Sequence, residues 1–152
     1  METIWRKEGT LEILARLSEN TLVDHLNIVF TEIGPDYLRA EMEVKSIVHQ
    51  PMGLLHGGAS VALAETVGSM AANLVVDETR YCVGLEINAN HVRPITHGVV
   101  TATAKPLALG RSIQVWEVRI ENESAKLICI SRLTMAVKKG GINPHDKAEK
   151  EP

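Results

Sequence analysis

The stretch of this chain that most limits its possible folds is residues 56–76. It reads HGGASVALAETVGSMAANLVV, a run of small and apolar helix formers with no proline and a single carboxylate, Glu65. At ~1.5 Å per residue this run predicts a helix roughly 31 Å long, about the width of a small domain. Because the run is apolar on nearly every side, we expect the helix to be buried, and its small residues let neighbouring backbones approach closely.

The segments on both sides of this helix have the character of β-strands. Residues 25–34 and 37–44 alternate apolar and polar side chains around the turn sequence GPD, which predicts a hairpin. A short amphipathic helix is expected before them, at residues 9–20. Four further strand-like runs follow the long helix, at residues 80–92, 98–109, 112–121 and 126–137. The predicted class is therefore α+β, with an antiparallel sheet wrapped around one long central helix.

Length, hydropathy and charge limit the number of domains, the location of the protein and the classes of partner it can bind. The 152 residues suffice for one domain with a sizeable core, which we assign to residues 1–138. The polar remainder, residues 139–152, is expected to be a disordered tail. No apolar run reaches the ~18 residues of a membrane span and no secretory signal is visible, so a cytoplasmic location is expected. The net charge of −3 offers nucleic acid no general attraction.

Cysteine and histidine spacing indicates neither a disulfide framework nor a metal site. Cys82 and Cys129 lie singly in strand-like segments, so we expect buried free thiols of a cytosolic protein. His56, His91 and Glu65 lack the helical His-Glu-x-x-His spacing of a zinc site, and no metal is expected. Three further histidines fall in loops or the tail and are expected on the surface: His49, His97 and His145.

Glu65 is the first candidate for chemistry, and two interpretations of it stay open. Most helix glutamates point to solvent. Its neighbours, however, form no polar stripe, and a buried carboxylate needs a partner or a role because burial disfavours its charge. Ser69, four residues on, lies on the same helix face and can hydrogen-bond the carboxylate or a water beside it.

The start of the helix is the second candidate. Gly57 and Gly58 carry no side chains to block approach, and the first backbone N–H groups of a helix are unpaired and lie at its positive end. This favours an anion or oxyanion site. The alternative is that the glycines serve only a tight turn into the helix. Gly57 and Glu65 are about 12 Å apart along the helix, whereas a catalytic carboxylate and an oxyanion donor must both lie within ~3 Å of the atoms of one carbonyl group. If both are catalytic, one must come from a second copy, which implies a dimer.

Three segments resemble the hotdog-fold acyl-CoA thioesterases: QPMGLLHGGASVALAETVGSMA, GLEINANHVRP and PLALGRSIQVWEV. The resemblance is greatest to the hydroxybenzoyl-CoA thioesterase-like group, which serves menaquinone and enterobactin synthesis, and it runs from about Trp5 to Val137. It implies a hotdog fold and a homotetramer of two dimers. It also implies hydrolysis of acyl-CoA thioesters with aromatic acyl groups, such as hydroxybenzoyl or dihydroxynaphthoyl, and no cofactor.

The resemblance also implies roles for individual residues. Glu65 would be the catalytic carboxylate, as nucleophile or as general base, with Ser69 supporting it or its water. The Gly57 N–H would polarise the thioester carbonyl with help from Gln50, and His56 would position the thioester. The implied substrate-binding residues are Gly84, His91, Val92, Arg93, Pro94, Ala108, Leu109, Gly110, Arg111, Ser112 and Ile113.

Several alternatives remain at this point. Arg93 and Arg111 are either solvated surface charges or contacts for the phosphates of coenzyme A. A hotdog dehydratase would need a Phe-x-Pro-Gly spacing that this sequence lacks. A non-catalytic acyl-CoA-binding module would be expected to have lost the carboxylate and to carry a fused DNA-binding domain.

Overall fold

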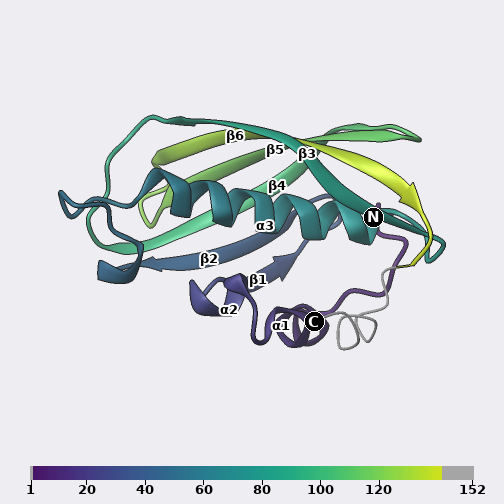
Figure 1. The fold of residues 1–152 in the computed structure, drawn as a ribbon, viewed down its shortest axis with the longest axis horizontal. Helices are drawn as coiled ribbons and strands as arrows, with labels where there is room; N and C mark the ends of the chain where they lie inside the picture. Colours follow the sequence, from purple (N-terminus) through teal and green to yellow (C-terminus); the bar gives the residue numbers. More distant parts are fainter. Residues whose placement is uncertain (1, 142–152) are drawn as a thin grey trace, which may run out of the picture.

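The computed structural model describes residues 2–141 of the chain. At its centre is α3, Gly57–Val75, a helix that crosses one face of a sheet (Figure 1). The His56 side chain caps the start of α3, and the chain leaves the helix in an extended conformation at Val76. The prediction of a helix over residues 56–76 is therefore confirmed to within one residue at each end.

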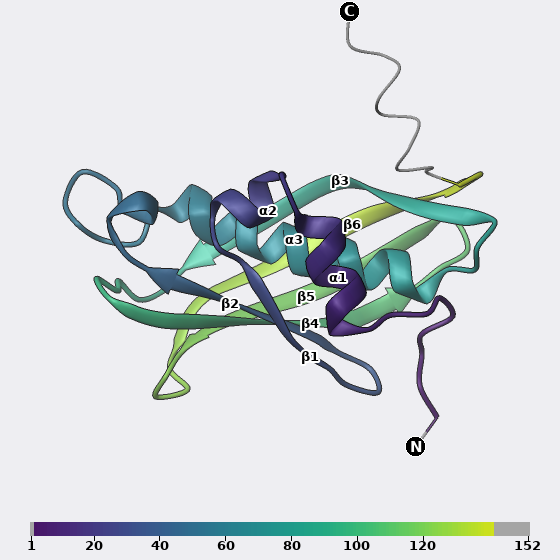
Figure 2. The same cartoon turned by 90° about the horizontal axis from the view of Figure 1, so that it is seen from below.

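Within residues 2–141, six strands form one antiparallel sheet in the spatial order β1-β2-β4-β5-β6-β3. They are β1, Val29–Ile33; β2, Leu38–Val44; β3, Arg80–His91; β4, Gly98–Leu109; β5, Ile113–Asn122; and β6, Leu127–Lys139. Seen from below, the sheet curls around α3 (Figure 2), so the predicted α+β architecture is confirmed. The curl pairs β3, the strand that follows α3, with the last strand of the sequence.

The side chains between α3 and the sheet form the hydrophobic core. On β5, Trp116, Val118 and Ile120 alternate inward and are fully buried, as the strand period of two predicts. The helix lies so close to β6 that a Cβ atom at Gly68 would stand 2.6 Å from Leu133 Cδ2. Glycine at this position therefore determines how near α3 approaches the strands.

The N-terminal region departs from the prediction in one respect. The expected amphipathic helix is α1, Leu11–Ser18, but a second helix, α2, Leu22–His25, follows it. Thr21 caps α2, and β1 begins only at Val29. The prediction of a strand from residue 25 was therefore wrong, because a four-residue helix is too short to leave a helical pattern in the sequence.

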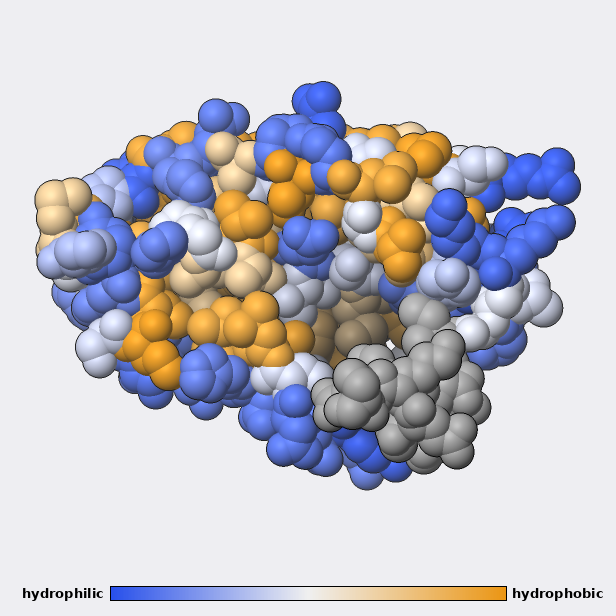
Figure 3. Space-filling model, viewed as in Figure 1, coloured by the Kyte–Doolittle hydropathy of each residue, from blue (hydrophilic) through white to orange (hydrophobic). Residues whose placement is uncertain are grey.

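One face of α3 is not enclosed, in contrast to the expectation of a fully buried helix. Ala62, Glu65 and Ser69 lie on a half-buried face. Beside it runs β3, an edge strand on which Val83 is 38% and Leu85 58% exposed. Figure 3 looks onto the side where α3 lies and shows hydrophobic side chains across its middle. An apolar face next to an unpaired strand edge is suited to binding another chain.

The C-terminal end of the described chain lies just beyond the predicted domain boundary. β6 continues to Lys139, one residue past the predicted end of the domain at residue 138. Most of the predicted tail, residues 142–152, lies outside the described residues. None of the helices in the described part of the chain is long and apolar enough to cross a bilayer.

Candidate active site

The first turn of α3 leaves one backbone donor free. The Gly58 N–H donates to His56 Nδ1 at 2.8 Å. The N–H groups of Ala59 and Ser60 both donate to the carbonyl of the same histidine. Within residues 2–141 the Gly57 N–H has no hydrogen-bond partner, and Gly57 lines a cavity of about 360 Å³. At the positive end of the helix, this N–H is placed to donate to an oxygen atom bound in the cavity.

The loop before α3 presents a second donor to the same cavity. The Gln50 N–H donates to the Leu54 carbonyl at 2.8 Å, and Gly53, at a φ of 79°, permits the tight turn between them. The side-chain oxygen of Gln50 accepts a hydrogen bond from the Met52 N–H. Its Nε2 amide is therefore the end of the side chain that remains for a ligand.

Two histidines border the start of the helix. Because His56 Nδ1 accepts the Gly58 N–H, the neutral imidazole of His56 carries its proton on Nε2. His91, at the end of β3, packs against Gly57 so closely that a Cβ atom there would lie 2.9 Å from His91 Nε2. A side chain at position 57 would thus displace His91 from the wall of the cavity.

Glu65 lies two turns further along α3, on the half-buried face. Its Oε1 faces β3, where a Cβ atom on Gly84 would stand 2.5 Å away. Among residues 2–141 the carboxylate has no ion-pair partner. The expected hydrogen bond from Ser69 is not formed either, because the Ser69 Oγ turns toward β6 and lies 3.7 Å from Met135 Sδ.

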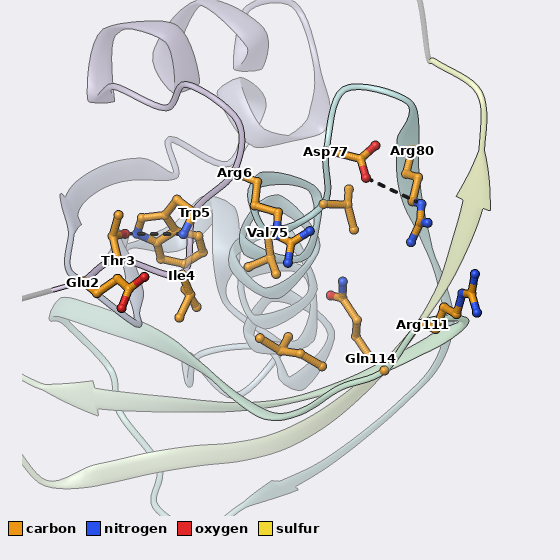
Figure 4. Close-up of a pocket in the computed structure, with 13 residues that line it drawn as sticks. Glu2, Thr3, Ile4, Trp5, Arg6, Val75, Asp77, Arg80, Arg111 and Gln114 are labelled. Carbon is orange, nitrogen blue, oxygen red and sulfur yellow. Dashed lines mark hydrogen bonds and ion pairs between the residues drawn. The ribbon is translucent and has the colours of Figure 1, made fainter.

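The structure gathers only part of the predicted site in one place. The cavity at the start of α3 is lined by the candidates Gln50, Gly57, His91, Val92, Arg93 and Pro94. The other predicted binding segment, residues 108–113, lies at the opposite end of α3. There Leu109, Gly110 and Arg111 line a different cavity together with Val75 (Figure 4). One chain therefore keeps the two halves of the predicted substrate site apart.

Comparisons with known proteins assign the chain to a family. The model of the thioesterase superfamily matches residues 52–129. This chain belongs to the thioesterase superfamily. Thioesterase HI1161 of Haemophilus influenzae is similar in structure, with a TM-score of 0.89 and 50% sequence identity, over 90% of this chain and 96% of that one. Proofreading thioesterase EntH of Cronobacter sakazakii is 48% identical over 134 residues, 88% of this chain and 98% of that protein.

A second solved thioesterase structure is similar to this chain in fold and sequence. A mutant of thioesterase PA1618 from Pseudomonas aeruginosa has a TM-score of 0.88 and 48% identity, over 90% of this chain and 99% of that one. The predictions of a hotdog fold, a thioesterase family and a thioester-hydrolysing enzyme are therefore confirmed.

The two cysteines of this thioesterase are buried, whereas the two arginines among the predicted binding residues are exposed to solvent. Cys82 and Cys129 are free and buried, and burial raises the pKa of Cys82 to about 11 and that of Cys129 in the same direction. Arg93 and Arg111 are exposed, and neither forms an ion pair within residues 2–141. No group of three or more metal-binding side chains occurs in that same range.

One residue of the thioesterase was missed by the sequence analysis. Gln114 is only 2% exposed, yet it lines the cavity at the far end of α3. Its oxygen accepts a hydrogen bond from Trp116 Nε1 at 2.9 Å. The alternation along β5 could have identified Gln114 from the sequence. It is a polar residue at an inward position, two residues before Trp116.

Proposed function

We propose that this thioesterase hydrolyses acyl-CoA thioesters to the free acid and coenzyme A, with Glu65 as the catalytic carboxylate and the Gly57 N–H as oxyanion donor. The observation that carries the proposal is the unpartnered Gly57 N–H at the start of α3. It lines the same cavity as the Gln50 side chain and His91, so a thioester carbonyl bound there would meet two donors.

The chemistry needs little beyond these groups. A thiolate leaving group has a pKa near ~8.5 and departs without a strong general acid. The reaction therefore requires a nucleophile and a place for the developing oxyanion, and one backbone donor contributes about 3–4 kcal/mol of transition-state stabilisation. Glu65 would either attack the carbonyl carbon or activate a water that does, and both routes use the same carboxylate position.

The active unit would be a homodimer with composite sites. Gly57 and Glu65 are about 12 Å apart on one helix, too far to act on one carbonyl, so Gly57 of one chain would work with the carboxylate of its partner. The half-buried face of α3 and the edge strand β3 support this arrangement, since both offer surface to a second copy. We further infer that two such dimers form a tetramer, as the family resemblance implies.

A dimer would also bring together the two binding segments that one chain keeps apart. The segment from His91 to Pro94 lies at the start of α3 and the segment from Ala108 to Ile113 at its end. With two α3 helices antiparallel, the first segment of one chain faces the second segment of the other, and Arg93 and Arg111 would contact coenzyme A phosphates. Gly84, beside Glu65, would contact the thioester end of the substrate.

We propose aromatic acyl groups as the substrates, of the hydroxybenzoyl or dihydroxynaphthoyl kind, which would place the enzyme in a pathway such as menaquinone synthesis. A cytoplasmic location is in keeping with two free cysteines. The test is thiol release from a panel of aryl-CoA and alkyl-CoA thioesters. Preference for the aryl substrates in kcat/KM supports the acyl assignment, and an equal or greater rate on alkyl substrates rejects it. Failure to release thiol from any of them rejects the proposed function itself.

A further inference from the structure

The strand β3 is tied to the helix α3 through one residue, Cys82. Within residues 2–141, three hydrogen bonds join these two elements, and each of them uses Cys82. The Cys82 N–H donates to Asn73 Oδ1 at 2.8 Å, and Asn73 Nδ2 donates to the Cys82 carbonyl at 3.1 Å. The Cys82 thiol donates to the Ala72 carbonyl at 3.3 Å. Asn73 therefore joins the start of β3 to the last turn of α3, and the two run side by side in Figure 1.

Both hydrogens of the Asn73 side-chain amide are used. Asn73 Nδ2 donates to the Ser69 carbonyl at 2.9 Å as well as to the Cys82 carbonyl. Because the amide meets two carbonyl groups at one end and an N–H group at the other, only one orientation satisfies it. Asn73 is half-buried and shares a face of α3 with Glu65 and Ser69, since the three are spaced by four residues. The face that carries the carboxylate thus also carries the group that holds β3.

Asn73 satisfies the backbone of β3 at the open edge of this strand. Cys82 is opposite Val137 in the ladder between β3 and β6. The Val137 N–H donates to the Ser112 carbonyl, on the side of β5, so Cys82 and Val137 form a pair without hydrogen bonds between them. The N–H and carbonyl groups of Cys82 consequently point away from β6, toward the edge at which the described sheet ends. Asn73 binds both groups, as a neighbouring strand would.

Cys82 lies two positions before the glycine that meets the Glu65 carboxylate. Cys82 and Gly84 face the same side of β3, about 7 Å apart along the strand. A Cβ atom on Gly84 would stand 2.5 Å from Glu65 Oε1. The pairing with β6 shifts register directly after Gly84, between residues 84 and 86. Since such a bulge disrupts the ladder locally, β6 constrains this part of β3 less than a regular ladder would.

We propose that Asn73 is a positioning residue for Glu65, an inference that rests on the proposed function. By holding Cys82 against α3, Asn73 fixes how near Gly84 lies to the helix, and with it the space that the Glu65 carboxylate occupies. Asn73 acts on the reaction only through the backbone of β3. Without its amide, this part of β3 is held by β6 alone, and the carboxylate loses the wall that directs it.

The first experiment measures kcat and KM for thiol release from an acyl-CoA, with the melting temperature of the same samples. For Asn73→Ala we expect kcat to fall about tenfold with KM nearly unchanged. This is less than the ~100-fold cost of a 1 Å displacement at a reacting group, because β6 still pairs with β3. Asn73→Asp removes both donors and places a negative charge against two carbonyl groups, so its kcat should be at least as low.

Ser18→Ala is the control for a loss of stability alone. It removes a buried hydroxyl that donates to the Leu14 carbonyl at 2.8 Å in α1, just as Asn73 donates to a carbonyl of its own helix. We expect a lower melting temperature and an unchanged kcat. Normal kcat in both Asn73 variants, with only the melting temperature lowered, overturns the proposal. The proposed function then still stands, because the wild type hydrolyses acyl-CoA.

The second experiment is a double-mutant cycle on kcat that combines Asn73→Ala with Gly84→Ala. In the wild type, the added methyl group presses on Glu65 because Asn73 holds β3 in place. In the Asn73→Ala background the strand can yield, so Gly84→Ala should lower kcat by a smaller factor. Equal factors in the two backgrounds overturn the proposal. If Asn73→Ala does not fold, Asn73→Asp takes its place in both experiments. Absence of thiol release by the wild type rejects the proposed function and this inference together.

Discussion

Gly84→Ala is expected to remove most of the thioesterase activity without destabilising the protein. Gly84 is exposed on β3 and its φ lies outside the left-handed region, so alanine can adopt the same backbone conformation. Such a change usually stabilises a protein by about 0.4–1 kcal/mol, because alanine restricts the unfolded chain. The new methyl group meets the far end of a flexible side chain, the Glu65 carboxylate, and lies at an ordinary contact distance of 3.9 Å from Met135 Sδ.

The size of the effect follows from that contact. A Cβ atom on residue 84 would stand 2.5 Å from Glu65 Oε1, whereas ordinary van der Waals contact begins at 3.4 Å. The carboxylate must therefore move by about 0.9 Å, the difference of the two values. A misplacement of ~1 Å at a reacting group costs about 100-fold in rate, which corresponds to about 2.7 kcal/mol of activation free energy.

The assay is kcat for acyl-CoA hydrolysis by thiol release, with the melting temperature measured on the same samples. Gly141→Ala is the matched control, because a Cβ atom there would meet nothing within 4 Å. A Gly84→Ala enzyme with normal kcat would show that Glu65 does not act from the position described. A raised KM at unchanged kcat would instead assign Gly84 to substrate contact alone.

Four further outcomes are expected. Glu65→Gln should lower kcat by about 10²–10⁴-fold with little change in KM, measured by steady-state kinetics, because the carboxylate acts in the transition state. Mixing Glu65→Ala chains with Gln50→Ala chains should restore roughly a quarter of wild-type activity, since half of randomly paired dimers are mixed and each has one intact site; no recovery after verified subunit exchange would contradict composite sites. Arg111→Ala should raise KM for acyl-CoA several-fold, with a smaller effect at high salt. Cys82 and Cys129 should resist alkylation in the native protein at pH 8, because burial raises the pKa of both thiols and holds them protonated; mass spectrometry of the labelled chain checks this.

The parts of the fold that sequence predicted well are those with long, uniform patterns. α3 has 19 residues and β3 to β6 have 10 to 13 each, so composition and alternation accumulate over many positions. The helix α2 has four residues and depends on the Thr21 cap, so it leaves no periodic signal. The short β1 was consequently predicted to begin too early.

Two candidate residues of the site could be picked out from the sequence, and their catalytic roles stay predictions. Gly57 and Glu65 stand out in the sequence because glycine and glutamate are unusual in an apolar helix. The free state of the Gly57 N–H was not readable, because it depends on His56 accepting the neighbouring amide. The direction of Ser69 was likewise out of reach, since helix spacing places it near Glu65 while packing turns its hydroxyl toward Met135. Spacing determines which residues share a face, and packing decides which atoms touch.

A ribosome releases β3 well before it releases the strand that pairs with it. β3 ends at His91, and its only neighbour in the described sheet, β6, begins at Leu127, after two other strands have been made. At ~5–20 residues per second, both edges of β3 stay open on the order of seconds during synthesis. In the proposed dimer, a second copy that docks on β3 would meet the finished sheet only after β6 has been released. A nonsense codon before β6 would release a chain with an open strand on both edges, which quality-control chaperones and proteases recognise.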